Sequence, residues 1–333
     1  MKFTEEESKP VYSTTILLAI DADSLIYKAA HIGEKVWNEA AIPANHPLFE
    51  ELKPDLHVEQ KVVLKGMIDG IIEDVRYAVN QKGKDIGEVQ LHYTPKSHVQ
   101  KERGLKPNFR YKLIDEYNEE HGGDHPGYKS GRKGMTLPEG LNELFDYAMG
   151  DERAVLSDGQ EADDVVVYEK MKNLEGVVIS CIDKDIYNSC PSGDIGHFNF
   201  NKREWIHTTH EEGQLFQHRQ ALTGDSSDTI KGIHRYGPRT AEKDLEGFTE
   251  DLWARTLAVF EAKGYSEEYG ILMMRLVGMF QGRGNTVELW NPPTVIPEEC
   301  IGCKYLQDGK PTKTCLHCED YNLYEEIVTS KTM

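Results

Sequence analysis

The chain has 333 residues, about twice the length of an average domain, so more than one structural unit is expected. It carries 57 acidic and 38 basic residues, a net charge of −19, and 38% hydrophobic residues. No apolar run approaches the roughly 18 residues that a membrane span needs, and the acidic N-terminus lacks the basic start of a secretory signal. Membrane and secreted classes are therefore excluded, and an acidic cytoplasmic protein is expected.

Predicted strands and helices alternate over the first 210 residues. Apolar runs predict strands at Ile16–Ile20, Val89–Tyr93, Arg153–Leu156 and Val177–Ile182. Helices are predicted at Ser24–Ala30, Val62–Val79, Pro138–Met149 and Glu161–Met171. We expect Ile195–Phe200 and Arg203–His207 to pair as a hairpin, and the chain after Thr209 to be mostly helical as far as Gln281. The alternation predicts an α/β fold with a mainly parallel central sheet.

A basic segment interrupts this acidic chain. Between Thr94 and Thr136 nine Lys and Arg residues stand against six Asp and Glu, so the segment has a net charge of +3 and the remainder −22. The segment is rich in Gly, Pro and aromatic residues. A local basic patch in an acidic protein favours an enzyme that binds a polyanion beside carboxylates that hold metal ions.

Carboxylates recur where predicted strands end or helices begin. They are Asp21 and Asp23, then Glu161, Asp163 and Asp164, then Asp183 and Asp185, then Asp225 and Asp228. The carboxyl ends of parallel strands meet at one edge of a sheet, so these side chains are expected to converge there. Nine converging carboxylates need cations to stay ionised, and hard oxygen donors suit two Mg²⁺ or Mn²⁺ ions. Taken singly, Glu161–Asp164 also fits an acidic first helical turn, and Asp183 with Asp185 a solvated turn.

The stretch 222–245 contains two glycine loops followed by a predicted helix start at Arg239. Backbone N–H groups there, together with nearby cations, can hold a phosphate without reading a base. The candidate DNA-binding residues are Lys231, Gly232, Arg235, Gly237, Arg239, Thr240 and Lys243. A turn with a purely structural role is the alternative.

Four of the six cysteines form a regular pattern near the C-terminus. Cys300 and Cys303 are separated by eleven residues from Cys315 and Cys318, which gives two CxxC pairs. In a reducing compartment this spacing predicts a four-thiolate structural Zn²⁺ site, with a ribbon-like turn around Gly309 and Pro311. Two coincidental or redox-active pairs are the alternative.

Several of these motifs together resemble the 5′ nuclease superfamily, which includes flap endonucleases, phage 5′–3′ exonucleases and the 5′-nuclease domain of DNA polymerase I. The matching motifs are AIDADSLIYKAA, EADDVV, IDKDIYN and GDSSDTIKGIHRYGPRTA, in the family's order and within residues 14–250. The resemblance implies a PIN-like α/β nuclease fold and a helix–three-turn–helix at 222–245. It implies metal ligands at Asp21, Glu161, Asp163, Asp164, Asp183, Asp185, Asp225 and Asp228.

The resemblance also extends into the basic segment. NFR at 108–110 and PGYKSGRK at 126–133 are similar to the family's arch, which implies that Arg110, Tyr128, Lys129 and Arg132 act at the scissile phosphate. Three features depart from the family. Pro95 stands where another aspartate is common, so that ligand is either absent or replaced by water. An acidic insert occupies Asp115–Asp124, and His234 lies in the hairpin. The insert makes Tyr111-Lys112 a second candidate for the arch pair.

These observations predict a metal-dependent 5′–3′ exonuclease with flap-endonuclease-like selectivity for DNA, of phage replication type. We expect a nuclease core at 1–210 with a basic arch at 94–136, a helical DNA-binding region at 211–290, and a zinc-binding tail at 291–333. The expected partners are DNA with a free 5′ end, flap or nick, and replication proteins, and the chain is expected to be a monomer. The alternatives are an RNase H-like primer-removing enzyme, which implies an RNA–DNA hybrid, a non-catalytic DNA-junction binder, and a toxin-type ribonuclease.

Overall fold

The computed structural model describes residues 14–39, 55–123, 125–132, 134, 136–247, 252–279, 282–283 and 286–293, and the backbone of 306–307 and 310–311. The chain divides into two compact units, Met1–Trp290 and Asn291–Met333. Within the described residues, no helix combines the length and the apolar character that crossing a membrane would require.

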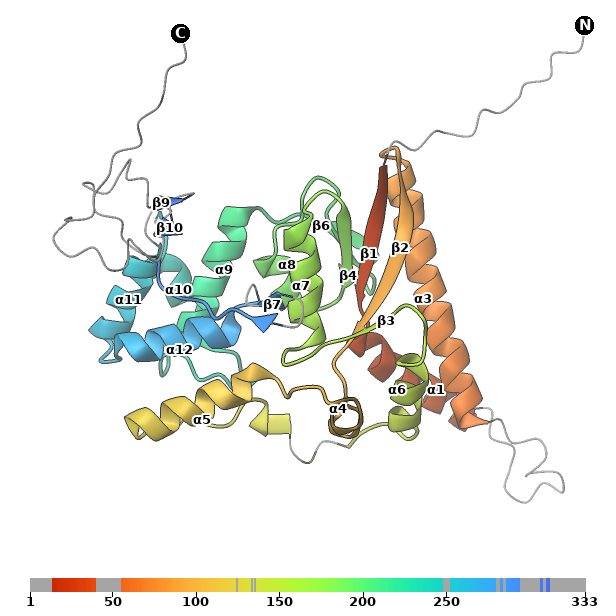
Figure 1. The fold of residues 1–333 in the computed structure, drawn as a ribbon, viewed down its shortest axis with the longest axis horizontal. Coiled ribbons are helices and arrows are strands. Elements are labelled where there is room, and N and C mark those ends of the chain that lie inside the picture. Colours follow the sequence, from red (N-terminus) through yellow and green to blue (C-terminus); the bar gives the residue numbers. More distant parts are fainter. Residues whose placement is uncertain are drawn as a thin grey trace, which may run out of the picture. The chain divides into compact units, whose positions relative to one another are not determined.

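The larger unit contains a six-stranded sheet in the order β3-β2-β1-β4-β5-β6 (Figure 1). The strands are β1 (Thr14–Asp21), β2 (Lys84–Tyr93), β3 (Ala154–Leu156), β4 (Val177–Cys181), β5 (His197–Asn199) and β6 (Glu204–Ile206). Neighbouring strands are parallel except β5 and β6, which pair as an antiparallel hairpin. The predicted mainly parallel sheet and its hairpin are confirmed.

Helices cover both faces of this sheet because β1 and β4 are apolar on both sides. Leu18 and Ile20 pack on one face with α1 (Asp23–Glu39), α3 (Leu56–Asn80) and α6 (Leu141–Ala148). Ala19 packs on the other face with α7 (Ala162–Lys172) and α8 (Lys184–Ser189). Alternate side chains of β1 thus pack into two apolar layers, one on each face of the sheet. The carboxyl end of β1 is fixed between these layers.

A second apolar core lies in the helical half of the same unit. Its helices are α9 (His210–Thr223), α10 (Pro238–Asp244), α11 (Leu252–Ala262) and α12 (Glu267–Val277). Fully buried residues such as Leu222, Phe260 and Met273 form its centre. A short pair, β7 (Gly282–Arg283) and β8 (Thr286–Val287), follows. The expectation of a mostly helical region after Thr209 agrees with these elements.

The basic segment folds into helices that its composition did not predict. They are α4 (Ser97–Arg103), α5 (Phe109–His121) and the short 3-10 helix η1 (Ser130–Arg132). Asn108 starts α5 by accepting the Arg110 N–H at 2.9 Å, and Gly122 ends it with φ 60°. Most of the acidic insert therefore lies on a helix, whose Ile114 packs into the helical core.

The smaller unit contains one described hairpin, in which β9 (Leu306–Gln307) pairs antiparallel with β10 (Lys310–Pro311). This hairpin lies in the sequence between the two CxxC pairs. Cys300, Cys303, Cys315 and Cys318 themselves lie outside the described residues, so the zinc site stays a prediction.

Candidate active site

A cavity of about 530 Å³ opens at the carboxyl edge of the sheet, where β1 ends. Five carboxylates line it: Asp21, Asp23, Glu161, Asp163 and Asp183. They come from three separate segments. Asp21 ends β1, Asp183 caps the start of α8 directly after β4, and Glu161 caps the start of α7. The structure therefore brings together more than half of the acidic set that the sequence singled out.

The carboxylates of this cavity repel one another strongly. Burial raises the pKa of Asp21 well above its usual range, and the charges of Asp23 and Asp183 raise it further. Burial, followed by the charges of Asp164 and Glu161, does the same to the pKa of Asp163. Positive charge placed beside such a cluster favours the ionised form of its carboxyl groups.

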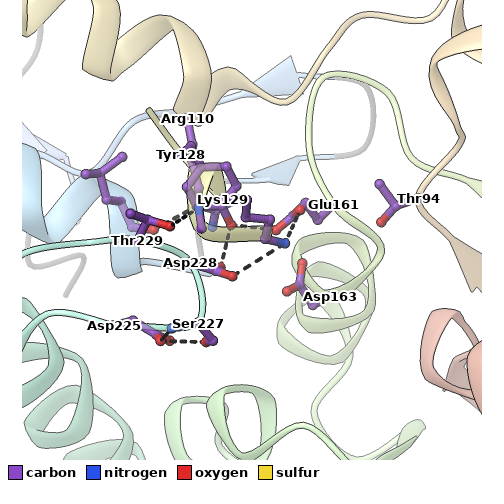
Figure 2. Close-up of polar contacts among 12 residues, drawn as sticks. Thr94, Arg110, Tyr128, Lys129, Glu161, Asp163, Asp225, Ser227, Asp228 and Thr229 are labelled. Atoms are coloured by element: carbon purple, nitrogen blue, oxygen red, sulfur yellow. Dashed lines mark hydrogen bonds and ion pairs between the residues drawn. The ribbon is translucent and has the colours of Figure 1, made fainter. Parts of the chain in front are cut away.

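One source of positive charge is Lys129, which lies beside two carboxylates (Figure 2). Its ammonium forms an ion pair with Glu161 and lies 3.7 Å from Oδ1 of Asp228. The Tyr128 hydroxyl lies 2.7 Å from both Oε2 of Glu161 and Oδ2 of Asp228, and its single proton can go to either. Burial alone would raise the pKa of Glu161, but Lys129 and then Arg110 outweigh it and lower that pKa.

The two candidate arch lysines occupy different positions, whereas Tyr111 lines the same cavity as Lys129. Lys129 lines the cavity, and its backbone has φ 54°, a left-handed conformation held by the Lys129 N–H bond to the Asp228 carbonyl at 2.8 Å. Lys112 instead has a side chain 77% exposed and pairs with Glu116 on its own helix. Tyr111 packs edge-on against the Tyr128 ring. The geometry favours Tyr128-Lys129. The side chain of Arg132 lies outside the described residues.

Arg110 does not reach into the cavity. Its side chain is 3% exposed and forms a bidentate pair with the fully buried Asp164, with both N–O distances at 2.7 Å. It also donates to the carbonyls of Leu276 and Gly278 at the end of α12. Asp164 in turn accepts the Glu161 N–H at 3.1 Å. Both residues were predicted to act at the metal or the phosphate, yet the structure places them in the interior, where they hold the start of α7.

Asp185 and Asp225 form a second acidic group outside the cavity lining. Burial and the charge of Asp183 raise the pKa of Asp185 to about 7. Burial alone would raise the pKa of Asp225, but hydrogen bonds from Ser227 and Asp185 lower it. Oδ1 of Asp185 is buried and has no hydrogen-bond partner among the described residues. An orphaned, buried carboxylate oxygen of this kind suits a cation.

The donor chemistry fits divalent ions that prefer oxygen. Within the described part of the chain, no three His, Cys, Asp or Glu side chains are arranged to hold one ion by themselves. Mg²⁺ takes only one or two carboxylates and keeps several waters, so pairs of these side chains are sufficient. Asp21, Glu161, Asp163 and Asp183 in the cavity, and Asp185 with Asp225 beside it, supply such pairs.

Thr94 is a site residue that the sequence patterns did not reveal. It follows β2, and its N–H donates to Oδ1 of Asp23 at 3.0 Å. Its hydroxyl accepts the Ala162 N–H at 2.9 Å, so it also ties β2 to the start of α7. Burial raises the pKa of Asp23 to about 6, although hydrogen bonds from the Thr94 hydroxyl and N–H act in the opposite direction. Pro95 lines the cavity next to Thr94. The carboxylate that contacts the end of β2 is therefore that of Asp23, through the Thr94 N–H.

The predicted DNA-binding hairpin is a tight turn that exposes its cations. Asp225 and Ile230 pair through two backbone hydrogen bonds, and Gly232 has φ 57°. A side chain at Gly232 would meet the backbone of Gly224 at 2.3 Å, so the close approach requires glycine. Lys231, Arg235, Arg239, Thr240 and Lys243 are exposed, and Gly237 caps α10. Pro238, the first residue of α10, has no N–H to offer a phosphate, whereas the exposed cations are available for phosphate contacts.

Comparison with known proteins places these features in a wider context. No protein-family model matches the chain. Over 138 residues the chain is 33% identical to the flap endonuclease Xni of Aeromonas hydrophila. The matched stretch covers 37% of this chain and 51% of that protein. The chain thus spans about half the length of the curated relative that it matches. The match confirms the resemblance to the 5′ nuclease superfamily.

Two solved structures are also similar. The D15 protein of phage T5, co-crystallized with metal ions, is 16% identical with a TM-score of 0.49, covering 79% of this chain and 89% of that one. The catalytic core of Rad2 in complex with a DNA substrate is 11% identical with a TM-score of 0.39, covering 86% of each chain.

Proposed function

We propose that this protein is a metal-dependent 5′–3′ exonuclease with flap-endonuclease-like selectivity for DNA structure. The observation that carries the proposal is the cavity at the carboxyl edge of the parallel sheet, where five carboxylates from separate segments meet Lys129. Sequence similarity to a flap endonuclease supports the same reaction class. Within this proposal, residues 1–210 form the nuclease core, 211–290 bind DNA, and 291–333 bind a structural zinc ion.

The carboxylates would hold two Mg²⁺ or Mn²⁺ ions. When bound, such ions activate a water and stabilise the charge on the attacking and leaving oxygens. The protein's part is to keep the ligands in place. Thr94 orients Asp23, Tyr128 orients Glu161, and Asp164 fixes the first turn of α7 through the Glu161 N–H.

Lys129 has a second task in this proposal. A scissile phosphate beside Glu161 would attract the ammonium that now pairs with that carboxylate, and the left-handed backbone at Lys129 already aims the side chain into the cavity. A half-buried cation at the developing charge of the phosphate lowers the barrier because water screens it less than it screens an exposed cation. The duplex would rest on the hairpin cations, which contact phosphates and read no base.

A cleavage assay with 5′-labelled flap, nicked and RNA-primed duplexes, in Mg²⁺ and in EDTA, tests the proposal. We expect short labelled products from the flap and nicked DNA in Mg²⁺ and none in EDTA. Faster cleavage of the RNA-primed duplex would make primer removal the function. Duplex binding without cleavage in Mg²⁺ or Mn²⁺ would show a non-catalytic DNA binder and overturn the proposal.

A further inference from the structure

A larger cavity, of about 860 Å³, lies beside the hairpin and is separate in its lining from the carboxylate cavity. Its walls come from the hairpin at 231–237, from α5 and from the turn between α11 and α12. Four tyrosines line it: Tyr117, Tyr236, Tyr265 and Tyr269. The volume falls in the range that accommodates a small ligand.

The charge of this cavity is opposite to that of the chain. Lys231 and Arg235 line it together with His125 and His234, and none of the described residues that line it is an Asp or a Glu. In a protein with 57 acidic residues, a cavity of this size whose described lining carries cations and no carboxylate is complementary to an anion. The lining therefore combines aromatic surface with positive charge.

Two of the tyrosine rings are held in place by the hairpin itself. The Tyr269 hydroxyl donates to the Gly232 carbonyl at 2.9 Å, and the Tyr265 hydroxyl accepts the His234 N–H at 3.1 Å. The two rings stack at 4.8 Å, and the Tyr117 ring of α5 lies 5.9 Å from Tyr269. One face of the Tyr117 ring stacks on His121 at 4.5 Å, and all three tyrosine side chains are only half-buried, so ordered ring surface remains exposed. Fixed aromatic surface binds flat ligands at little entropic cost.

We propose that this cavity binds one unpaired nucleotide of a DNA strand. The base would lie against Tyr117 and the Tyr265–Tyr269 pair, and the adjoining phosphate beside Lys231 and Arg235. Aromatic side chains with neighbouring cations are the usual platform for unpaired bases, whereas a fully paired duplex presents no free base face. The inference rests on the proposed function, because it places the unpaired nucleotide next to a duplex that the hairpin holds.

Binding of two duplexes in EDTA tests the site: one fully paired, the other identical except for a single unpaired thymidine nucleotide. We expect the wild type to prefer the second duplex by about fivefold or more, the lower end of aromatic–base stacking. Tyr117→Ala should lose this preference and keep its affinity for the paired duplex, whereas Tyr117→Phe should keep both. Tyr77→Ala, a matched control at an exposed tyrosine of α3, should also keep the preference.

Photo-cross-linking of the wild type locates the nucleotide without any variant. With 5-bromodeoxyuridine at the unpaired position, we expect adducts on Tyr117, Tyr265 or Tyr269. Adducts confined to other residues, or no preference for the unpaired nucleotide, would overturn the inference. If the wild type shows no such preference but still cleaves flaps in Mg²⁺, the inference fails and the nuclease proposal stands. A preserved preference without any cleavage would contradict the nuclease proposal alone.

Discussion

Replacing Arg110 with methionine should destabilise the protein severely, because it leaves Asp164 as a buried carboxylate without a partner. Asp164 is fully buried and Arg110 is 3% exposed, so solvent cannot take over the lost contacts. Removing one member of a buried ion pair costs about 3–5 kcal/mol of the free energy of unfolding. For a unit of this size, that loss lowers Tm by roughly 6–20 °C.

The double variant Arg110→Met with Asp164→Leu provides the matched control. It removes both charges and fills their space with apolar atoms, so most of the lost free energy should return. About 1 kcal/mol should stay missing, because Asp164 no longer accepts the Glu161 N–H at the start of α7. Both variants should cleave DNA poorly because Glu161 loses its support.

Urea unfolding followed by circular dichroism in EDTA measures these differences, and the four proteins of the cycle give the coupling energy between Arg110 and Asp164. A loss below about 1 kcal/mol for Arg110→Met would refute the reasoning, as would a double variant no more stable than the single one. Arg110 would then be free to act in the arch.

Lys129→Ala should lower kcat by about 10²-fold or more with little change in duplex affinity. Lys112 is exposed, so Lys112→Ala should leave single-turnover cleavage unchanged. If Lys129→Ala changed only the affinity, the proposed role of Lys129 would be contradicted. Burial lowers the pKa of His218 from 6.5 to about 4, below its value in the unfolded chain, so His218 favours folding above pH 6.5 and that contribution is lost as the pH falls toward 4. Urea unfolding at pH 7 and pH 5 should therefore show a steeper loss for the wild type than for His218→Gln, and equal slopes would contradict this assignment. Elemental analysis should find one zinc per chain in the wild type and none in Cys303→Ser. Cys181→Ser is the control and should keep the zinc, because Cys181 is buried in the sheet core. Less than about a tenth of an equivalent in the wild type would rule the zinc site out.

Outside the basic segment, the order of strands and helices was predictable from the apolar residues alone, because buried strands and amphipathic helices leave different apolar patterns. Ile16–Ile20 and Val177–Ile182 are buried on both faces, and such strands appear in the sequence as continuous apolar runs. The acidic residues that follow them were therefore placed correctly at the edge of the sheet. Local pattern was sufficient there because parallel strands share one carboxyl edge.

Helix α5 and the role of Arg110 were not predictable in the same way. Along α5 only Arg110 and Ile114 are buried, so the helix shows no apolar stripe that a periodicity could reveal. An arginine that pairs with a buried aspartate also looks in sequence like an arginine exposed in an arch. Only the tertiary contacts of Arg110 with α7 and α12, more than 50 residues away along the chain, distinguish these two roles.

Mg²⁺-dependent cleavage of a 5′-labelled DNA flap by the wild type and by Asp163→Asn tests the carboxylate cavity most directly. Asp163 lines the cavity. Unlike Asp164 and Glu161, it forms no ion pair with a basic residue among the described residues that would give it a structural role. We predict cleavage by the wild type in Mg²⁺ and none in EDTA. Asp163→Asn should bind the duplex as well as the wild type does. Its cleavage rate should be lower by at least about 10²-fold. Wild-type cleavage in EDTA, or near wild-type cleavage by Asp163→Asn, would contradict the assignment of this cavity as a metal-dependent nuclease site.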